Sequence, residues 1–320
     1  MCLEENPLEQ EEIRIARVVR QERGAWTVEV DGRARLIAHV RGEERPVVGD
    51  EVELRPGLEA IERVLPRRSV VARRRAGTRG EAQVLAANAD AALVVMGLDG
   101  DYNPRRLERY LAMTAGCGVR AAVVLNKRDV CADAARRVDE IRGLVEGVAV
   151  VAMSALGDDA GMVVKGLVER GETVVLLGSS GAGKSTLVNR LLGREEMATG
   201  VVREGDDRGR HTTTSRRLLA MPGGWWLIDI PGLREVGLLP GASAPDTAFG
   251  GVRALAAGCR FRDCTHTVEP GCAVRERIPE ERLTSFQKLS REGGFHDRRY
   301  QKQMQKALRA FQRTERFNRW

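Results

Sequence analysis

The sequence predicts an α/β protein in which a parallel sheet with helices follows a small β barrel and precedes a helical zinc-binding module. Three observations lead to this prediction. Short alternating apolar stretches fill residues 12–70, a strand, glycine loop and helix pattern spans residues 172–192, and three cysteines and a histidine lie within residues 259–272. We expect domains at 1–75 (barrel with basic linker), 76–240 (α/β domain) and 241–320 (zinc-binding helical domain with basic tail).

The first region is expected to form the barrel. Apolar and polar side chains alternate in residues 14–20, 25–31, 34–40 and 51–54, and Gly or Pro residues separate these stretches. Such short strands favour an OB-fold first and an SH3-like barrel second. OB-folds often bind nucleic acid, but a barrel that only docks on its own α/β domain is an alternative. We expect Trp26 and His39 in the barrel core or on its face, and a basic linker or loop at residues 67–80.

The segment 178–185 matches the phosphate-loop pattern G-x-x-x-x-G-K-[ST] without a mismatch. An apolar strand, residues 173–177, precedes it, and a helix, residues 186–192, follows it. Glycines allow the backbone N–H groups to surround phosphates. We expect Lys184 to add a positive charge and to act in catalysis, and Ser185 to bind Mg²⁺.

The sequence N-K-x-D follows a second apolar strand, residues 121–125, and consists of Asn126, Lys127, Arg128 and Asp129. Nucleotides bind at the carboxyl ends of strands in open α/β sheets. The Asp129 carboxylate can accept hydrogen bonds from guanine N1–H and the exocyclic amine, a donor pair that adenine lacks. The next strand, residues 148–153, leads to Ser154 and Ala155, which are expected to form the second wall of a guanine pocket.

Two further elements come after the phosphate loop. A strand that ends in D-x-P-G carries Asp229, expected to hold Mg²⁺ through water, and Gly232, whose amide is expected to sense the γ-phosphate. The polar segment 209–215 has the composition of a switch I loop. One of its threonines should complete the Mg²⁺ shell, Thr213 first and its neighbour Thr212 as the alternative.

The order of these motifs is unusual, because in most GTPases the phosphate loop precedes N-K-x-D. It predicts a circularly permuted Ras-like P-loop GTPase domain, which a sheet tolerates when old termini join at the surface and new ones open elsewhere. The expected GTP-binding residues are Asn126, Lys127, Arg128, Asp129, Ser154, Ala155, Gly178, Ser179, Ser180, Gly181, Ala182, Gly183, Lys184, Ser185, Thr186, Thr212, Thr213, Asp229 and Gly232.

The spacing C-x4-C-x-H-x5-C indicates a metal site formed by Cys259, Cys264, His266 and Cys272. Three thiolates and one imidazole suit a tetrahedral structural zinc, one per chain, and such a set leaves no open coordination position for catalysis. The alternative is a loop of reduced cysteines. Helices are expected at residues 279–287 and 298–312.

Composition limits location and partners. The acidic, polar N-terminus does not resemble a signal peptide, and no apolar run approaches a membrane span, so we expect a cytoplasmic protein that binds no membrane. The net charge is +7, and residues 291–320 hold nine Lys and Arg against three Asp and Glu. Arg67, Arg68, Arg73, Arg74, Arg75 and Arg79 form a second basic cluster. Contact with RNA phosphates is expected at both, although ordinary solvated surface is the alternative for the tail.

With these motifs the chain resembles the small-ribosomal-subunit-dependent GTPase A family (RsgA/YjeQ) of circularly permuted bacterial GTPases, over nearly its whole length. The segments that carry the resemblance are VGDEV (48–52), PRRSVVARR (66–74), AANAD (86–90), NKRD, GSSGAGKST, GRHTTT, DIPG, the Cys/His loop and SREGGFHDRR (290–299). The resemblance implies GTP hydrolysis stimulated by the small (30S) ribosomal subunit, late in that subunit's assembly. It makes GTP, GDP, the small subunit and its rRNA the expected partners of a chain that we expect to be a monomer.

Other interpretations remain open from the sequence. An RNA-binding assembly factor that uses GTP only as a structural ligand is one, and a P-loop ATPase or kinase, which N-K-x-D disfavours, is another. Leu233 stands where Ras-like GTPases have a water-orienting glutamine, so unaided hydrolysis should be slow. His211 is the catalytic candidate within the chain. A merely packing His211 and a donor from the ribosome are the alternatives.

Overall fold

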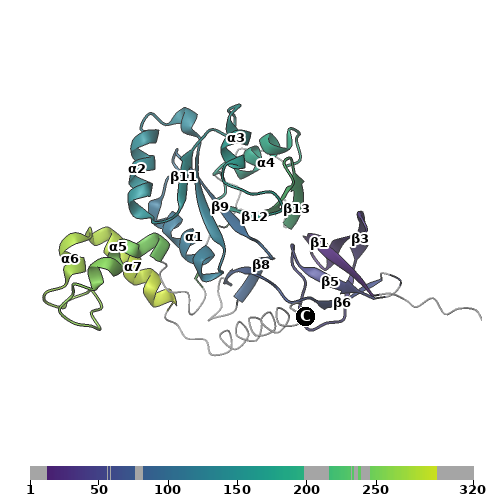
Figure 1. The fold of residues 1–320 in the computed structure, drawn as a ribbon, viewed down its shortest axis with the longest axis horizontal. Helices are drawn as coiled ribbons and strands as arrows, with labels where there is room; N and C mark the ends of the chain where they lie inside the picture. The colour runs from purple at the N-terminus through teal and green to yellow at the C-terminus, as the bar shows by residue number, and fades with distance from the viewer. Residues whose placement is uncertain are drawn as a thin grey trace, which may run out of the picture.

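A computed structural model describes residues 13–55, 57, 59–75, 82–197, 216–231, 233, 237–238 and 246–293. Figure 1 shows three parts: a small barrel, a sheet covered by helices, and a compact group of helices. The strand pairings and helix positions described below confirm the expected fold class.

The N-terminal strands close into an OB-fold barrel. They are β1 (Arg14–Glu22), β2 (Ala25–Val30), β3 (Arg33–Ile37), β4 (His39–Val40), β5 (Glu51–Leu54) and β6 (Ala60–Val64). β1 pairs with β2 and β5, β2 with β3, and β5 with β6, all antiparallel, while β4, which continues β3, closes the barrel through a parallel pairing with β6. This strand order is that of a five-stranded OB-fold.

The barrel core follows the period-two pattern of its strands. Val18, Val28 and Val52 are fully buried in it. Trp26 is buried, and its indole Nε1 donates to the Pro46 carbonyl at 2.7 Å, whereas His39 is exposed on β4.

The barrel docks on its own α/β domain. β1 pairs with β5 along its first part and with β2 along its second part, and its end also pairs with a strand of the central sheet, where Arg20 lies opposite Arg217. Arg17 donates to Thr173 Oγ1 at 2.7 Å, and its guanidinium lies 5.3 Å from the ring centre of Trp226. These contacts hold the barrel against the edge of the central sheet.

The central sheet has the order β11-β10-β9-β12-β14-β13. Its strands are β9 (Ala91–Gly97), β10 (Arg120–Asn126), β11 (Ala149–Ala152), β12 (Thr173–Gly178), β13 (Arg216–Met221) and β14 (Trp225–Asp229). All neighbours are parallel except β13 with β14. Every residue of β9 is buried, because helices cover both sheet faces and an uninterrupted apolar run suits such a position.

Four helices cover the sheet, two on each face. Leu107 and Leu111 of α1 (Pro104–Gly116) and Ile141 of α2 (Ala134–Leu144) pack in one core cluster. Val164 of α3 (Ala160–Lys165) and Leu187 of α4 (Lys184–Leu192) pack in the other. These helices therefore cover both faces of the sheet.

The predicted basic linker is partly wrong. Residues Val70–Arg74 form β7, which pairs antiparallel with β8 (Ala82–Ala87) in a separate two-stranded sheet. The consecutive residues Val71 and Ala72 are both buried, and the pairing with β8 is irregular between them, so β7 lacks the regular alternation that predicts a strand. The Arg74 N–H also donates to the Gly237 carbonyl at 2.9 Å.

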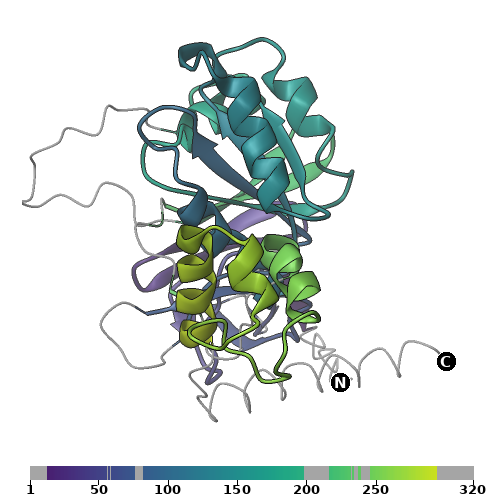
Figure 2. The same ribbon diagram turned by 90° about the vertical axis from the view of Figure 1, so that its left-hand side faces the viewer.

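The C-terminal helices are α5 (Asp246–Ala256), α6 (Ala273–Arg277) and α7 (Glu280–Gly293). Figure 2 shows this yellow-green group as a compact unit beside the α/β domain. Phe249, fully buried, meets the Phe286 ring edge to face at 5.3 Å. The expected helix at 279–287 is confirmed by α7, and the one expected at 298–312 lies outside the described residues. Over the described ranges, none of the helices has both the length and the apolarity that a membrane crossing requires.

Candidate nucleotide-binding site and metal centre

The loops that the sequence singled out meet at one edge of the sheet. β9, β10, β11, β12 and β14 run parallel, so their carboxyl ends share that edge. N-K-x-D follows β10, Ser154 and Ala155 follow β11, the phosphate loop follows β12, and Asp229 ends β14. This is where open α/β sheets bind ligands.

The phosphate loop has a backbone that only glycine allows at two points. Gly178 has φ +147°, and a Cβ there would lie 2.3 Å from the Val95 carbonyl oxygen. Gly183 has φ +91°, and a Cβ there would lie 2.2 Å from Asn126 Nδ2. The loop then enters α4, whose N-terminus attracts anions through its free N–H groups and dipole.

Lys184 lies buried across this loop. Its ammonium donates to the carbonyls of Gly178 at 2.9 Å and Ser179 at 2.6 Å. Burial lowers the pKa of Lys184 to about 8, and the carboxylates of Asp229 and Asp101 oppose that shift. Burial likewise raises the pKa of Asp229, against Lys184 and Arg217. Phosphate groups at this position would favour the charged ammonium.

The other phosphate-loop positions differ in exposure. Ser180 and Gly181 are exposed, whereas Ala182 is buried. Ser185 and Thr186 are half-buried in the first turn of α4. The loop therefore presents its middle residues to solvent and tethers its two ends.

Asn126 joins the phosphate loop to the second base loop. Its side chain is buried, its Nδ2 donates to the Ala182 carbonyl at 2.9 Å, and its Oδ1 accepts from the Ala155 N–H at 2.8 Å. Ser154 is also buried, and its Oγ accepts from the Leu156 N–H at 3.3 Å. The side-chain amide of Asn126 thus connects its own loop to the phosphate loop and to the loop after β11.

The remaining N-K-x-D residues reach outward. Lys127 has φ +66°, and its ammonium lies 2.6 Å from Asp99 Oδ2. Arg128 and Asp129 are exposed in the 3₁₀ turn η1 (Arg128–Val130), and Arg128 lies 3.3 Å from Asp159.

Several predicted site residues lie outside the described residues, namely His211, Thr212, Thr213 and Gly232. Leu233, next to Gly232, is described and buried. Its N–H donates to the Gly178 carbonyl at 3.3 Å, and its carbonyl accepts from the Tyr110 hydroxyl at 3.0 Å.

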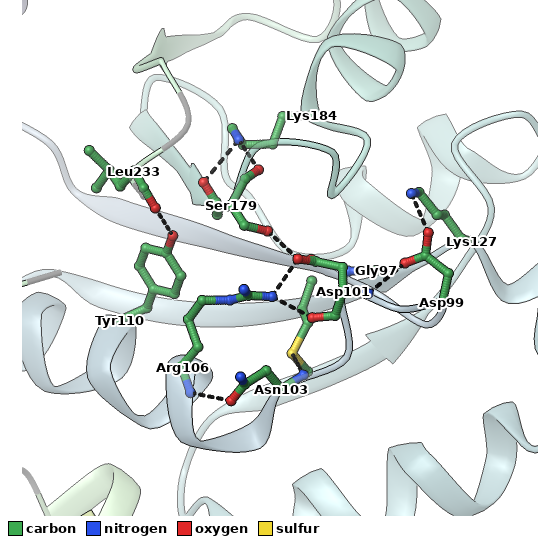
Figure 3. Close-up of polar contacts among 12 residues, drawn as sticks. Gly97, Asp99, Asp101, Asn103, Arg106, Tyr110, Lys127, Ser179, Lys184 and Leu233 are labelled. Atoms are coloured by element: carbon green, nitrogen blue, oxygen red, sulfur yellow. Dashed lines mark hydrogen bonds and ion pairs between the residues drawn. The ribbon is translucent and has the colours of Figure 1, made fainter. Parts of the chain in front are cut away.

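Sequence reasoning missed a group of polar residues after β9 that reaches this site. Figure 3 shows Asp101 between Ser179 and Arg106, Asp99 beside Lys127, and Tyr110 beneath Leu233. The available signal was position alone, because this segment also follows a parallel strand at the ligand-binding edge.

The four predicted metal ligands come together. The ligand atoms of Cys259, Cys264, His266 and Cys272 lie within 4.8 Å of one another. Cys259 Sγ is 3.7 Å from His266 Nδ1 and 3.9 Å from Cys272 Sγ, and His266 Nδ1 is 3.3 Å from Cys272 Sγ. A tetrahedral zinc with bonds of about 2.3 Å to sulfur sets its ligand atoms roughly 3–4 Å apart. The cluster therefore fits a tetrahedral metal ion.

Comparison with known proteins agrees with this architecture. Residues 64–239, more than half of the chain, match the family model for the RsgA GTPase. The chain is 49% identical over 236 residues to the small ribosomal subunit biogenesis GTPase RsgA of Xylella fastidiosa (strain M12), an alignment that covers 73% of this chain and 70% of that protein. It is 46% identical over 272 residues to the protein of the same name from Opitutus terrae, with 79% and 74% covered.

Two solved structures are similar in fold. The crystal structure of YjeQ from Thermotoga maritima has a TM-score of 0.61 and 25% identity, and the comparison covers 88% of this chain and 98% of that one. YloQ, described as a circularly permuted GTPase, has a TM-score of 0.60 and 17% identity, with 90% and 97% covered. A parallel sheet with N-K-x-D before the phosphate loop, and a relative that is 49% identical, lead to one conclusion. The chain belongs to the RsgA family of circularly permuted GTPases.

Proposed function

We propose that this protein is a GTP-hydrolysing switch that acts in late maturation of the small (30S) ribosomal subunit and turns over faster when bound to that subunit. The observation that carries the GTP site is the joining of three loops by Asn126 at the open edge of the sheet. The subunit as partner is inferred from relatives whose name includes small ribosomal subunit biogenesis. The proposal places the protein in the cytoplasm, as a monomer in contact with rRNA.

The proposed roles follow from geometry and chemistry. Asp129, exposed beside the pocket, reads guanine, and the Lys127 stem lies along the base. The phosphate loop, residues 178–186, holds the phosphates, with Lys184 as its positive charge. Ser185 and Thr213, or Thr212 in its place, would hold Mg²⁺, with Asp229 acting through water and the Gly232 amide contacting the γ-phosphate. When bound, Mg²⁺ neutralises the charge of the phosphate groups.

We infer that the attacking water is oriented only when this protein is bound to the small subunit. Leu233 is buried and has no polar side-chain atom, so it cannot orient the attacking water. We therefore propose that unaided hydrolysis is slow. His211 in the switch I segment supplies the orienting group when the subunit orders that loop, with a ribosomal donor as the alternative.

The test compares GTP turnover with and without purified small subunits, together with co-sedimentation in GDP and in a non-hydrolysable GTP analogue. We expect stimulation by the subunit, tighter binding in one nucleotide state, and loss of most turnover in Lys184→Ala. In His211→Ala, stimulation should disappear while subunit binding persists. Nucleotide-independent binding without stimulation would instead identify a constitutive assembly factor with GTP as a structural ligand.

We also propose that the Cys₃His cluster holds one structural zinc ion. Its soft thiolate donors suit Zn²⁺ rather than Mg²⁺ or Ca²⁺. His266 is buried and its carbonyl accepts from Gln287 Nε2 of α7 at 2.7 Å, so the metal loop is tied to the longest of the three described C-terminal helices.

A further inference from the structure

The loop between β9 and α1, residues 98–103, carries two carboxylates that reach both nucleotide loops. It begins after Gly97, where a Cβ would lie 2.4 Å from Asp99 Oδ1 and 3.2 Å from Asp101 Cβ. The loop is therefore folded tightly over the end of β9. Asp99 Oδ1 also accepts from the Asp101 N–H at 3.1 Å, which links the two acids.

Asp101 holds the phosphate loop. Its Oδ1 accepts from Ser179 Oγ at 2.6 Å, and its Oδ2 accepts from the Gly97 N–H at 3.1 Å. Arg106, in the first turn of α1, pairs with the same carboxylate and donates to the Asp101 carbonyl. The Asp101 side chain is only 13% exposed, so this charge is neutralised locally and its position is restrained.

Asp99 holds the base-reading lysine. Its Oδ2 lies 2.6 Å from the Lys127 ammonium, which stands on a left-handed backbone at the end of β10. A Cβ placed on Gly183 would lie 3.9 Å from Lys127 Cε, so the lysine stem passes beside the phosphate loop. The ion pair restrains the end of that stem.

The two ion pairs explain why Asp99 and Asp101 can lie beside a site proposed to bind the negatively charged phosphates of GTP. Asp99 is paired with Lys127, and Asp101 with Arg106, so these four side chains carry no net charge. Asp101 also meets Ser179 from the β9 side of the phosphate loop. Neither carboxylate has to face a phosphate to make its contacts.

We propose that Asp99 and Asp101 are positioning residues of the GTP site: Asp99 acts through Lys127 on nucleotide binding, and Asp101 acts through Ser179 on the alignment of the phosphates for hydrolysis. This inference rests on the proposed GTP site, and it adds two residues that act through others. The roles are separable, because one acid contacts the base-reading loop and the other contacts the phosphate loop.

The test uses Asp99→Asn, Ser179→Ala and Asp101→Asn in the full-length protein. Ser179→Ala removes only the hydroxyl and leaves the Asp101–Arg106 pair, so it still tests the contact if Asp101→Asn fails to fold. Asp139→Asn is the matched control, since its carboxylate belongs to an exposed ion pair with Arg142 on α2. Affinities for GDP and a non-hydrolysable GTP analogue, single-turnover hydrolysis at saturating GTP, and thermal unfolding are measured for each.

We expect Asp99→Asn to weaken GDP and GTP binding equally, by about fivefold, with the hydrolysis rate at saturation unchanged, because the pair is partly exposed. Ser179→Ala and Asp101→Asn should lower that rate by about tenfold or more, since a displaced phosphate loop misaligns the γ-phosphate. Unfolding temperatures of Asp99→Asn and Ser179→Ala should remain near the control value.

The two levels of the claim fail differently. If the unmodified protein binds and hydrolyses GTP while Asp99→Asn and Ser179→Ala behave like Asp139→Asn, this inference is wrong and the GTP site stands. If the unmodified protein binds no guanine nucleotide, both are overturned. A fall in activity that only tracks lost thermal stability also overturns the positioning roles.

Discussion

At the scale of single residues, Arg67 shows how a basic cluster can serve the interior. Its side chain is only 7% exposed, and its guanidinium meets both oxygens of the fully buried Asp50, at 2.6 and 2.8 Å. The Val47 N–H donates to the same carboxylate at 2.7 Å. Burial raises the pKa of Asp50 although Arg67 opposes the shift. The expectation that Arg67 contacts RNA phosphate is therefore wrong, because its buried guanidinium is already paired with Asp50 and with Glu44.

Replacing Arg67 should destabilise the fold. Arg67→Met leaves Asp50 buried without its cation, which should cost about 3–5 kcal/mol in the free energy of unfolding. Urea titration measures the change. The matched control is Arg68→Met, because the Arg68 side chain, which pairs with Asp90, is 55% exposed. Exposed ion pairs contribute about 0–1 kcal/mol. Equal losses in the two variants would contradict the assignment.

At the scale of elements, helix α1 contacts both the nucleotide site and the C-terminal helices. Asn103 caps its N-terminus through the Arg106 N–H at 3.0 Å. Tyr110 meets Leu233, next to the D-x-P-G motif. On its other side, Glu108 accepts from Ser285 Oγ of α7 at 2.7 Å, and Arg109 pairs with Glu292 at 2.8 Å. A shift of the segment at Leu233 would therefore act on a helix that also holds α7.

Removing one hydroxyl tests this connection. Burial raises the pKa of Tyr110, so its hydroxyl stays a donor to the Leu233 carbonyl. Tyr110→Phe should cost about 1 kcal/mol of stability and leave that carbonyl without its donor. We expect a changed ratio of GTP to GDP affinity, measured by nucleotide titration, with subunit-stimulated turnover altered as well. Tyr102→Phe is the control, since Tyr102 donates instead to Glu140 on the outer side of α2. Identical nucleotide ratios in both variants would contradict the connection.

The contact between α1 and α7 should depend on pH. Burial raises the pKa of Glu108 above its ordinary value of 4.5, against the Ser285 hydrogen bond and the Arg282 charge. The folded state therefore binds the proton more tightly than the unfolded state. The stabilisation that comes from protonated Glu108 is complete below pH 4.5, and it is lost as the pH rises through the folded-state pKa of Glu108.

Glu108→Gln removes this titration. Relative to the unmodified protein, it should gain stability as the pH is raised from 4 toward 7, about 1 kcal/mol in unfolding free energy for each unit of pKa difference. Urea titrations across that range measure the trend. Glu281→Gln is the matched control, because that carboxylate is 84% exposed.

At the scale of the whole molecule, the barrel and the C-terminal helices are stabilised in different ways. The barrel has a core cluster of its own, and the α/β domain buries one cluster on each face of its sheet. Phe249, Val274 and Leu283 of the C-terminal helices belong to one of those two sheet clusters, and the Cys₃His cluster lies in the same helical part. A helical group of this size gains most from a metal ion, which links loop and helix at one point.

Metal removal should therefore act on one part of the molecule. Structural zinc contributes on the order of 10 kcal/mol to the folding of small domains at neutral pH. Cys259→Ser, or strong chelation, should unfold α5–α7 while nucleotide binding at the α/β domain persists. Metal analysis and far-UV circular dichroism measure the outcome, with Cys131→Ser as the control because Cys131 lies outside the cluster. Substantially less than one zinc per chain in protein purified without chelator would count against the site.

The sequence by itself determined whatever depends on neighbouring residues. The phosphate loop needs glycines beside Lys184 and Ser185, and the metal site needs four ligands within residues 259–272, so both are complete in a short segment. The alternation of apolar and polar residues along each barrel strand is also a local pattern, and the order of the motifs can be read directly from the sequence. For that reason the fold class and the candidate loops could be predicted.

Only the tertiary structure decided which distant groups become partners. Asp101 reaches Ser179 across 78 positions and Asp99 reaches Lys127 across 28, and no local period relates such pairs. The same holds for Arg67, whose side chain is buried where it pairs with Asp50, 17 positions away. Exposure of a charge is a property of the packed surface. The physical reason is that the neighbouring sequence determines a residue's backbone conformation. The partners of its side chain, and the dielectric environment around it, depend on distant segments that the fold brings beside it.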